Sequence, residues 1–362
     1  MNKDDREIKG EIEYMKKLIF LAVLAAMMFL PFKTANAAAI KVVTTITDYA
    51  YFAREIGGEK VKAVSICQGD ENVHYVRPKP SFVKLCQDAD LFVGTGLDLE
   101  LWVPDLLEKS ANKNIQSGQN GYVAAADGIK MLEIPTVLSR SEGGLHVYGN
   151  PHITVGPLNA LQIIDNILIG LRKVSPENSA FFEKNHAELK KRLIDSIFGE
   201  TLPGIVSADE LAAMARNNTL IAFLKENKLK GEPLIDKLGG WLKKAMPLRG
   251  SKIANYHRSW IYFTSFFGIE SAAEIEPKPG IPPTPKHILE VIETIKKHNI
   301  RIIFSENFYD TKKVMYVAEE TGARPVVVPT YVDGERGVDT YFKLVDIWLD
   351  RMLEASIVKG IN

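Results

Sequence analysis

The sequence predicts an α/β protein of two lobes, each with a mainly parallel sheet, joined by a long helical connector. Three observations support this prediction. Short β-branched runs alternate with helical segments from residue 40 to about 110, which is typical of a parallel sheet. Strand character then disappears after residue 157 and returns after Arg249, where the same alternation resumes. We therefore expect lobes at 38–156 and 249–362, with the connector at 157–248.

The first lobe is expected to contain three pairs of a strand and a helix. Its strands are rich in Val, Ile and Thr, as in IKVVTTI, and its helices end at Gly or begin at Pro-Ser. The expected strands are 40–46, 61–67 and 89–96, and the expected helices are 48–58, 80–89 and 99–110.

The connector shows apolar residues at helical spacing. PLNALQIIDNILIGLRKV (157–174) is the first expected helix, and a longer, charged one follows at 175–199 after a Ser-Pro-Glu start. Residues 200–235 resemble an added helical hairpin, in which we find no chemical motif. Its role is left open by the sequence.

The second lobe repeats the pattern of the first. Its expected strands are 251–257, 300–306 and 323–329, and its expected helices are 259–268, 287–299, 314–322 and 340–356. The proline-rich stretch 274–285 is too short for a linker between domains, so we expect a surface loop.

The N-terminus has the three parts of a secretory signal. From Met15 it reads MKKLIFLAVLAAMMFLPFKTANA, with two lysines, a short apolar run and an Ala-Asn-Ala end. We expect residues 1–37 to be a signal peptide with an upstream extension, and the exported protein to be periplasmic. No cysteine lies at the expected cleavage point, so a lipid anchor is not indicated. Cys67 and Cys86 could form a disulfide or remain two buried thiols.

Charge gives no argument for nucleic acid, because 45 basic residues balance 45 acidic ones. Motifs for the common enzyme classes are also missing: the sequence has no GxSxG elbow, Walker-A loop or GxGxxG after a strand. Neither a nucleophilic enzyme nor a nucleotide-binding one is therefore indicated.

Three histidines stand where a predicted strand ends and a loop begins: His74, His152 and His257. Ligands of open α/β sheets bind at the carboxyl ends of strands. Glu306 and Asp333 follow strands of the second lobe, and His146 lies in a loop without a clear assignment. Imidazoles with one carboxylate suit Zn(II), Mn(II) or Fe(II), although no local ligand motif such as HExxH supports this.

Three blocks of sequence resemble the metal-binding, solute-binding proteins of bacterial ABC importers for zinc and manganese, the ZnuA/TroA-like family. They are HYVRPKPSFVKLCQDADLFVGTGLDLELW, NPHITVGP and NYHRSWIYFTSFFG, in the family's order and at roughly its spacing. Asn150 replaces the aspartate that the family usually has in the second block. The resemblance runs from about residue 40 to the C-terminus, apart from the added hairpin.

The resemblance implies two lobes joined by a long helix, with one metal ion in the cleft between them. His74 and His152 would come from the first lobe and His257 from the second, with either Glu306 or Asp333 as the fourth ligand. The ion would be transported cargo handed by a monomer to a membrane permease. Three neutral imidazoles favour zinc, with manganese or iron as alternatives.

The alternative is a metal-dependent hydrolase that uses the same donor set. In that reading three ligands would leave an open position for an activated water, and Glu306 or Asp333 would act as the base. The sequence has no signal for a substrate pocket, so we favour capture and delivery of a metal.

Overall fold

The computed structural model describes residues 13–18, 38–135, 146–278 and 280–357. The chain forms two compact units, Met1–Ala38 and Ala39–Asn362. In the first unit residues 13–18 are helical, and most of the expected signal peptide lies outside the described residues. Among the described residues, no helix is long and apolar enough to cross a membrane. All further description concerns the second unit.

The first lobe contains a parallel four-stranded sheet in the order β2-β1-β3-β4. Its central strand β1 is buried along most of its length, as its β-branched composition predicts. The edge strand β4 was not predicted from the sequence. The strands are β1 (Ile40–Thr44), β2 (Val61–Ser65), β3 (Leu91–Gly94) and β4 (Tyr122–Ala124), and the helices are α2 (Thr47–Gly57), α3 (Pro80–Gln87) and α4 (Val103–Ser110).

The second lobe repeats this architecture with a parallel sheet in the order β10-β9-β7-β8. Strand β8 was also missed by the sequence pattern. The strands are β7 (Lys252–Asn255), β8 (Glu270–Glu274), β9 (Ile302–Glu306) and β10 (Arg324–Val328), and the helices are α10 (Ile261–Phe267), α11 (Pro285–Lys297), α12 (Thr311–Thr321) and α13 (Tyr341–Ser356).

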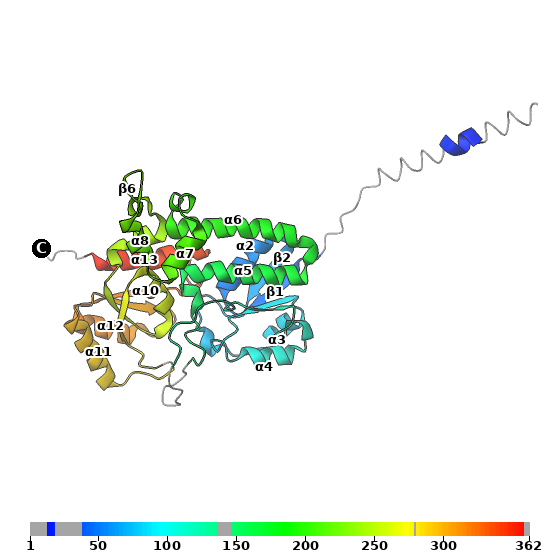
Figure 1. Cartoon of the computed structure of the whole chain (residues 1–362). Coiled ribbons are helices and arrows are strands. Elements are labelled where there is room, and N and C mark those ends of the chain that lie inside the picture. The colour runs from blue at the N-terminus through cyan, green and yellow to red at the C-terminus, as the bar shows by residue number, and fades with distance from the viewer. Residues whose placement is uncertain (1–12, 19–37, 136–145, 279, 358–362) are drawn as a thin grey trace, which may run out of the picture. The chain divides into compact units, whose positions relative to one another are not determined.

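Two long helices, α5 (Pro157–Val174) and α6 (Ser179–Phe198), lie side by side and connect the lobes (Figure 1). Both pack against α2 of the first lobe. The fold is therefore the predicted one, two α/β lobes with a long helical link.

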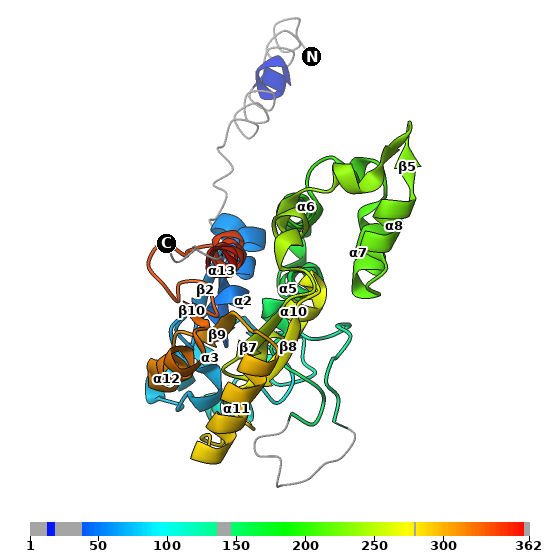
Figure 2. The same cartoon turned by 90° about the vertical axis from the view of Figure 1, so that its left-hand side faces the viewer.

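The stretch after α6 folds as short helices and a small hairpin. Helices α7 (Ala208–Arg216) and α8 (Leu220–Glu226) pack together, and Figure 2 shows them beside the two long connector helices. The two-stranded hairpin β5 (Lys228–Leu229) and β6 (Glu232–Pro233) follows, and then α9 (Gly240–Lys244). The apolar residues of α7 and α8 join the hydrophobic core that runs through both lobes.

Buried hydrogen bonds join the lobes directly, in addition to the connector. The Thr47 hydroxyl donates to the Val332 carbonyl (2.5 Å), and the Val332 amide donates to Asp48 Oδ1 (2.7 Å). The Tyr341 hydroxyl, on the last helix, donates to the Thr154 carbonyl (2.7 Å). These contacts tie the segment that follows β1 to the loop after β10, and the last helix to the segment before α5.

Cys67 and Cys86 are both buried and both free, so the structure contains no disulfide between them. Burial raises the pKa of the Cys86 thiol to about 12. A buried thiol with a raised pKa is a poor nucleophile and a poor metal ligand at neutral pH. These cysteines serve as small core residues of the first lobe.

Candidate metal centre

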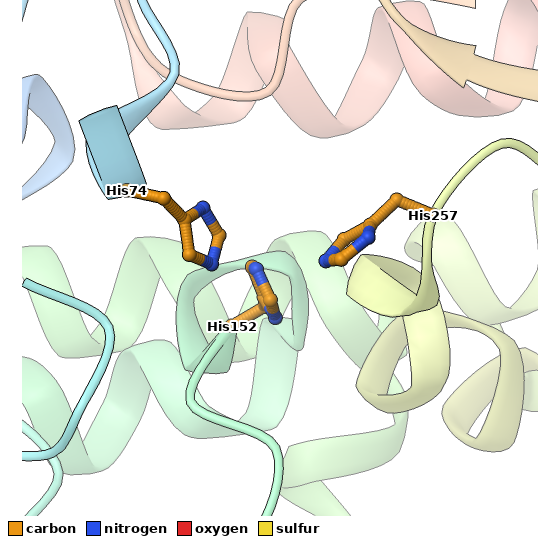
Figure 3. Close-up of side chains that lie close together, drawn as sticks. All are labelled: His74, His152 and His257. Atoms are coloured by element: carbon orange, nitrogen blue, oxygen red, sulfur yellow. The ribbon is translucent and has the colours of Figure 1, made fainter. Parts of the chain in front are cut away.

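His74, His152 and His257 converge from three separate segments of the chain. Each offers a ring nitrogen that lies within 4.8 Å of a ring nitrogen of the other two. Figure 3 shows the three rings pointing toward one another. Their ring centres are 5.1, 5.3 and 5.8 Å apart. The structure therefore brings together the three histidines that the sequence singled out.

His74 lies on a 3₁₀ turn, Val73–Tyr75, in the segment that leads from β2 to α3. Asn72 begins this turn, and its Oδ1 accepts from the His74 backbone amide (3.1 Å). The same oxygen contacts His74 Nδ1 at 2.8 Å. Because this atom accepts from an amide, it is the oxygen, and Nδ1 carries the hydrogen that it receives. The Nε2 atom of His74 therefore carries a lone pair that can bind a cation.

Asn150 fixes His152 in the same way. Its Oδ1 accepts from the His152 backbone amide (3.1 Å) and lies 2.8 Å from Nδ1. Its Nδ2 donates to the Arg258 carbonyl (2.6 Å) and to Glu133 Oε2 (2.8 Å), so the orientation of the amide is not ambiguous. The asparagine therefore supports the ring through its oxygen while its nitrogen links both lobes. Pro151 and Pro157 restrict the backbone around the histidine.

His257 comes directly after β7, and Glu276 holds its ring. Glu276 Oε2 accepts from His257 Nδ1 in a very short contact, and its other oxygen accepts from the Gly280 amide (3.0 Å). A carboxylate on Nδ1 makes the imidazole a stronger base at Nε2. Glu276 lies in the loop that the sequence marked only as proline-rich, so its role was not predicted.

The site is largely buried and electrostatically prepared for a cation. The Nε2 atoms of His152 and His257 are buried and have no hydrogen-bond partner among the described residues. Burial, together with the neighbouring imidazoles, lowers the pKa of His74 to about 3 and that of His152 well below its usual range. Both rings are therefore neutral at physiological pH, which is the state that binds a metal.

Glu306 and Asp333, the two predicted alternatives for the fourth ligand, have different surroundings. Glu306 ends β9, is fully buried, and neither of its carboxylate oxygens has a hydrogen-bond partner among the described residues. Burial raises its pKa to about 7, although nearby His257 opposes the rise. Asp333 is exposed, in a loop after β10, with its backbone in the left-handed region (φ 61°). Neither carboxylate belongs to the cluster of three imidazoles.

A fourth imidazole, His146, also reaches this centre. Its Nε2 lies 3.4 Å from Nε2 of His74, and its ring centre is 5.6 Å from that of His152. The sequence left His146 without an assignment, because its proximity to His74 depends on the path of a loop. The only signal in the sequence for a role at this centre was its position, six residues before His152 in a segment with no helical or strand pattern.

Comparison with known proteins places the chain in a family. The family described as "Zinc-uptake complex component A periplasmic" matches residues 42–197 and 207–355. The chain belongs to this family. The unmatched gap falls at the start of the added helices, where the sequence departs from the resemblance.

Relatives of the zinc-uptake family with different metals in their names align with nearly the whole chain. The manganese ABC transporter substrate-binding lipoprotein PsaA of Streptococcus pneumoniae is 24% identical, with 94% of this chain and 99% of the relative covered. The iron-binding protein YfeA of Yersinia pestis is 26% identical, with 89% and 86% covered.

Solved structures show the same fold. A crystal structure of ZnuA covers 88% of this chain and 100% of its own, with 21% identity and a TM-score of 0.64. A Mn-bound periplasmic metal-binding protein from Candidatus Liberibacter asiaticus covers 86% and 98%, with 18% identity and a TM-score of 0.61. These likenesses concern the fold alone.

The protein is thus a metal-binding substrate-binding protein of an ABC transporter. Members of this family act outside the cytoplasm and deliver metal to a membrane permease, and they are not enzymes. The hydrolase alternative is therefore set aside. A cavity of about 260 Å³ does lie beside α5, but its lining includes Lys130, Gln162 and Arg216 and none of the histidines.

Proposed function

We propose that this protein captures Zn(II) and delivers it to its permease. The observation that carries the proposal is the convergence of His74, His152 and His257. Each ring is held at Nδ1 by an acceptor, and each directs Nε2 toward the others. Rings prepared in this way lose little freedom when they bind an ion.

We propose Glu306, and not Asp333, as the carboxylate ligand. A buried carboxylate whose two oxygens find no partner in the described part of the chain lacks compensation for its desolvation, and a cation would supply it. Its electrostatic interaction with His257, one of the proposed ligands, supports this choice. The exposed Asp333 has no such need for a partner.

The choice of zinc follows from the chemistry of the donors. Imidazole nitrogen suits zinc, whereas manganese prefers sites dominated by oxygen. A set of three imidazoles and one carboxylate has more nitrogen than oxygen, so we expect zinc to outcompete manganese. Iron(II) should bind with an affinity between those of manganese and zinc. Because relatives are named for manganese and for iron, the metals need to be compared directly.

We propose further that the protein works in the periplasm as a monomer, after removal of a signal peptide that ends near Ala37. The support is the order of charged, apolar and small residues from Met15 to that position. The balanced charge of the chain offers no attraction to nucleic acid.

Zinc titration of the chain from Ala38 onward tests the proposal. We expect one ion per chain and, for His152→Ala, a loss of affinity larger than the roughly 10–100-fold caused by losing a supporting hydrogen bond. His298→Ala is the matched control, because His298 is exposed and remote from the centre in the sequence. Equal binding by His152→Ala and wild type would contradict the proposed centre.

Competition between metals tests the cargo. Wild-type protein loaded with manganese should exchange it for an equimolar amount of zinc, while the zinc-loaded protein should retain its metal against manganese. Glu306→Gln should weaken binding of both metals, and Asp333→Asn should leave both unchanged. If Asp333→Asn proves the more damaging substitution, the assignment of the fourth ligand is wrong.

A further inference from the structure

The cavity of about 260 Å³ beside α5 lies where four parts of the chain meet, and the metal centre makes no use of it. Two of these parts are the loop after β4 and the start of α5. The others are the end of α7, among the added helices, and helix α10 of the second lobe. A molecule in this cavity would therefore contact both lobes and the added helices at once.

Two basic side chains, Lys130 and Arg216, line the cavity. Both residues are exposed, so their charges stand at its mouth, and neither side chain has an ion pair or hydrogen bond to another described residue. The described residues of the lining include no aspartate or glutamate. A single unpaired cation is common on a protein surface. Two that share one cavity without an acid make its mouth attractive to an anion.

The walls inside the mouth combine apolar surface with fixed polar groups. Leu158 and Phe266 are buried and supply the apolar contact. Asn159 and Gln162, one turn apart on α5, are held by their amide nitrogens, which donate to a backbone carbonyl of the preceding turn (3.0 Å) and to Asn166 Oδ1 (3.1 Å). A packing defect would be apolar throughout, as empty cavities in proteins are. A few placed polar groups in an apolar wall are instead typical of a ligand site.

Tyr262 fixes the walls of the cavity relative to one another. It lines the cavity from α10, and its hydroxyl donates to the Asn150 carbonyl (2.7 Å) and accepts from the Leu132 amide (3.2 Å) of the first lobe. At the start of α5, a Cβ added to Gly156 would lie only 2.8 Å from Cβ of Tyr262. Because the walls are held in this way, little freedom would be lost when a ligand enters.

We propose that this cavity binds a small organic anion, with the acidic group on Arg216 and Lys130 and an apolar body against Leu158 and Phe266. The guanidinium group of an arginine matches two oxygens of a carboxylate or a phosphate. The volume is that of about eight or nine water molecules in the liquid, which suits a compact ring or a short chain. The site is separate from the metal centre and does not depend on which metal the protein carries.

Calorimetric titration of the metal-free protein with four small probes tests this chemistry. Benzoate carries a carboxylate on an apolar ring, and phenyl phosphate carries a phosphate on the same ring. Benzamide has the ring without the charge, and inorganic phosphate has the charge without the ring. We expect at least one of the two ringed anions to bind with a dissociation constant on the order of 1 mM or below, and both other probes to bind at least about tenfold more weakly. The tighter of the two ringed anions identifies the acidic group.

Three variants test the position of the site. Arg216→Gln removes the charge and keeps a polar side chain, so it should weaken binding of the tighter anion at least about tenfold, the scale of a charge-assisted hydrogen bond. Ser265→Leu places a larger side chain in the cavity from α10 and should abolish binding. Lys225→Gln is the matched control, because Lys225 is an exposed cation of the neighbouring helix α8 that does not line the cavity. Circular dichroism of each variant checks that the fold is intact.

The inference is overturned if neither ringed anion binds, or if Arg216→Gln binds the anion as tightly as Lys225→Gln does. Equal binding of benzamide and benzoate would exclude a role for the two basic residues. Equal binding of inorganic phosphate and phenyl phosphate would exclude a role for the apolar wall. None of these results bears on zinc binding, since none of the three histidines lines the cavity.

Discussion

Asn150 uses every polar atom of its side chain. The oxygen supports His152, while the nitrogen donates to the carboxylate of Glu133 and to the Arg258 carbonyl of the other lobe. An aspartate, the usual residue of the family here, would support the ring equally well. It could not make the two donations, so the surroundings of this position in this chain require the amide.

Asn150→Asp should therefore lower the stability of the protein. The substitution turns a donor into an acceptor that faces Glu133 and a carbonyl oxygen, at a cost of about 1–3 kcal/mol for the lost and unsatisfied contacts. Repulsion by Glu133 would raise the pKa of the new carboxyl group, so the cost should shrink at acidic pH, where it is protonated. Urea unfolding of the variant and wild type at pH 8 and pH 5 measures this. A difference that is independent of pH would contradict the account.

The histidines of the centre could be found from the sequence, but their supporting groups could not. His74 and His257 follow predicted strands of parallel sheets, whose carboxyl ends meet at one edge, and His152 stands out in the proline-flanked segment NPHITVGP. Glu276, which holds His257, lies 19 residues away in the proline-rich loop, and Asp98, whose Oδ1 lies 3.1 Å from Nδ1 of the neighbouring His146, lies 48 residues away. Their contacts depend on loop paths, about which hydrophobic periodicity carries no information.

Two loops of opposite lobes meet backbone to backbone at Gly69 and Gly334. A Cβ added to Gly69 would lie 2.3 Å from the Val332 carbonyl oxygen and 2.4 Å from the Gly334 amide. A Cβ on Gly334 would lie 2.5 Å from the Gly69 carbonyl oxygen. Only glycine permits this approach, which sets the separation of the loop after β2 from the loop after β10.

Gly69→Ala should push these loops apart. Backbone atoms cannot rotate away as a side chain can, so we expect a loss of about 1–3 kcal/mol in the free energy of unfolding. Zinc affinity should fall too, because His74 lies in the segment that would move. Gly204→Ala is the matched control, since a Cβ there meets nothing within 4 Å. The free energy of unfolding and the zinc affinity of both variants measure this. Equal values for Gly69→Ala and Gly204→Ala would contradict the prediction.

Long elements were predicted well, and short ones were not. Helix α5 runs over Pro157–Val174, the range that the sequence predicts, because its proline start and apolar periodicity are both strong. Strands β4 and β8 were missed. Their sequences, YVA and ESAAE, are short or poor in β-branched residues, and they form through pairing with β3 and β7.

A buried carboxyl group lies at the junction of the two lobes. Asp48, near the start of α2, is fully buried and accepts from the Val332 amide across the junction, while its Oδ2 has no hydrogen-bond partner within the described ranges. Burial raises the pKa of Asp48 to about 7, against the opposing effect of that amide. The lobes are therefore joined through a group that changes its protonation near neutral pH.

Asp48→Asn should remove a dependence of stability on pH. The pKa of an aspartate is about 3.9 in the unfolded chain and about 7 in this folded one, so the folded state holds an extra proton between these values. The contribution of Asp48 to stability is therefore full below pH 4 and is lost as pH rises to 7, by up to about 4 kcal/mol.

Asparagine keeps the acceptor for Val332 and cannot ionise. Glu306, whose pKa is also raised to about 7, is present in both proteins and cancels in their difference. Urea unfolding of metal-free protein should show Asp48→Asn gaining stability relative to wild type as pH rises from 4 to 7. A constant difference over that range would mean that Asp48 is ionised in the folded protein throughout.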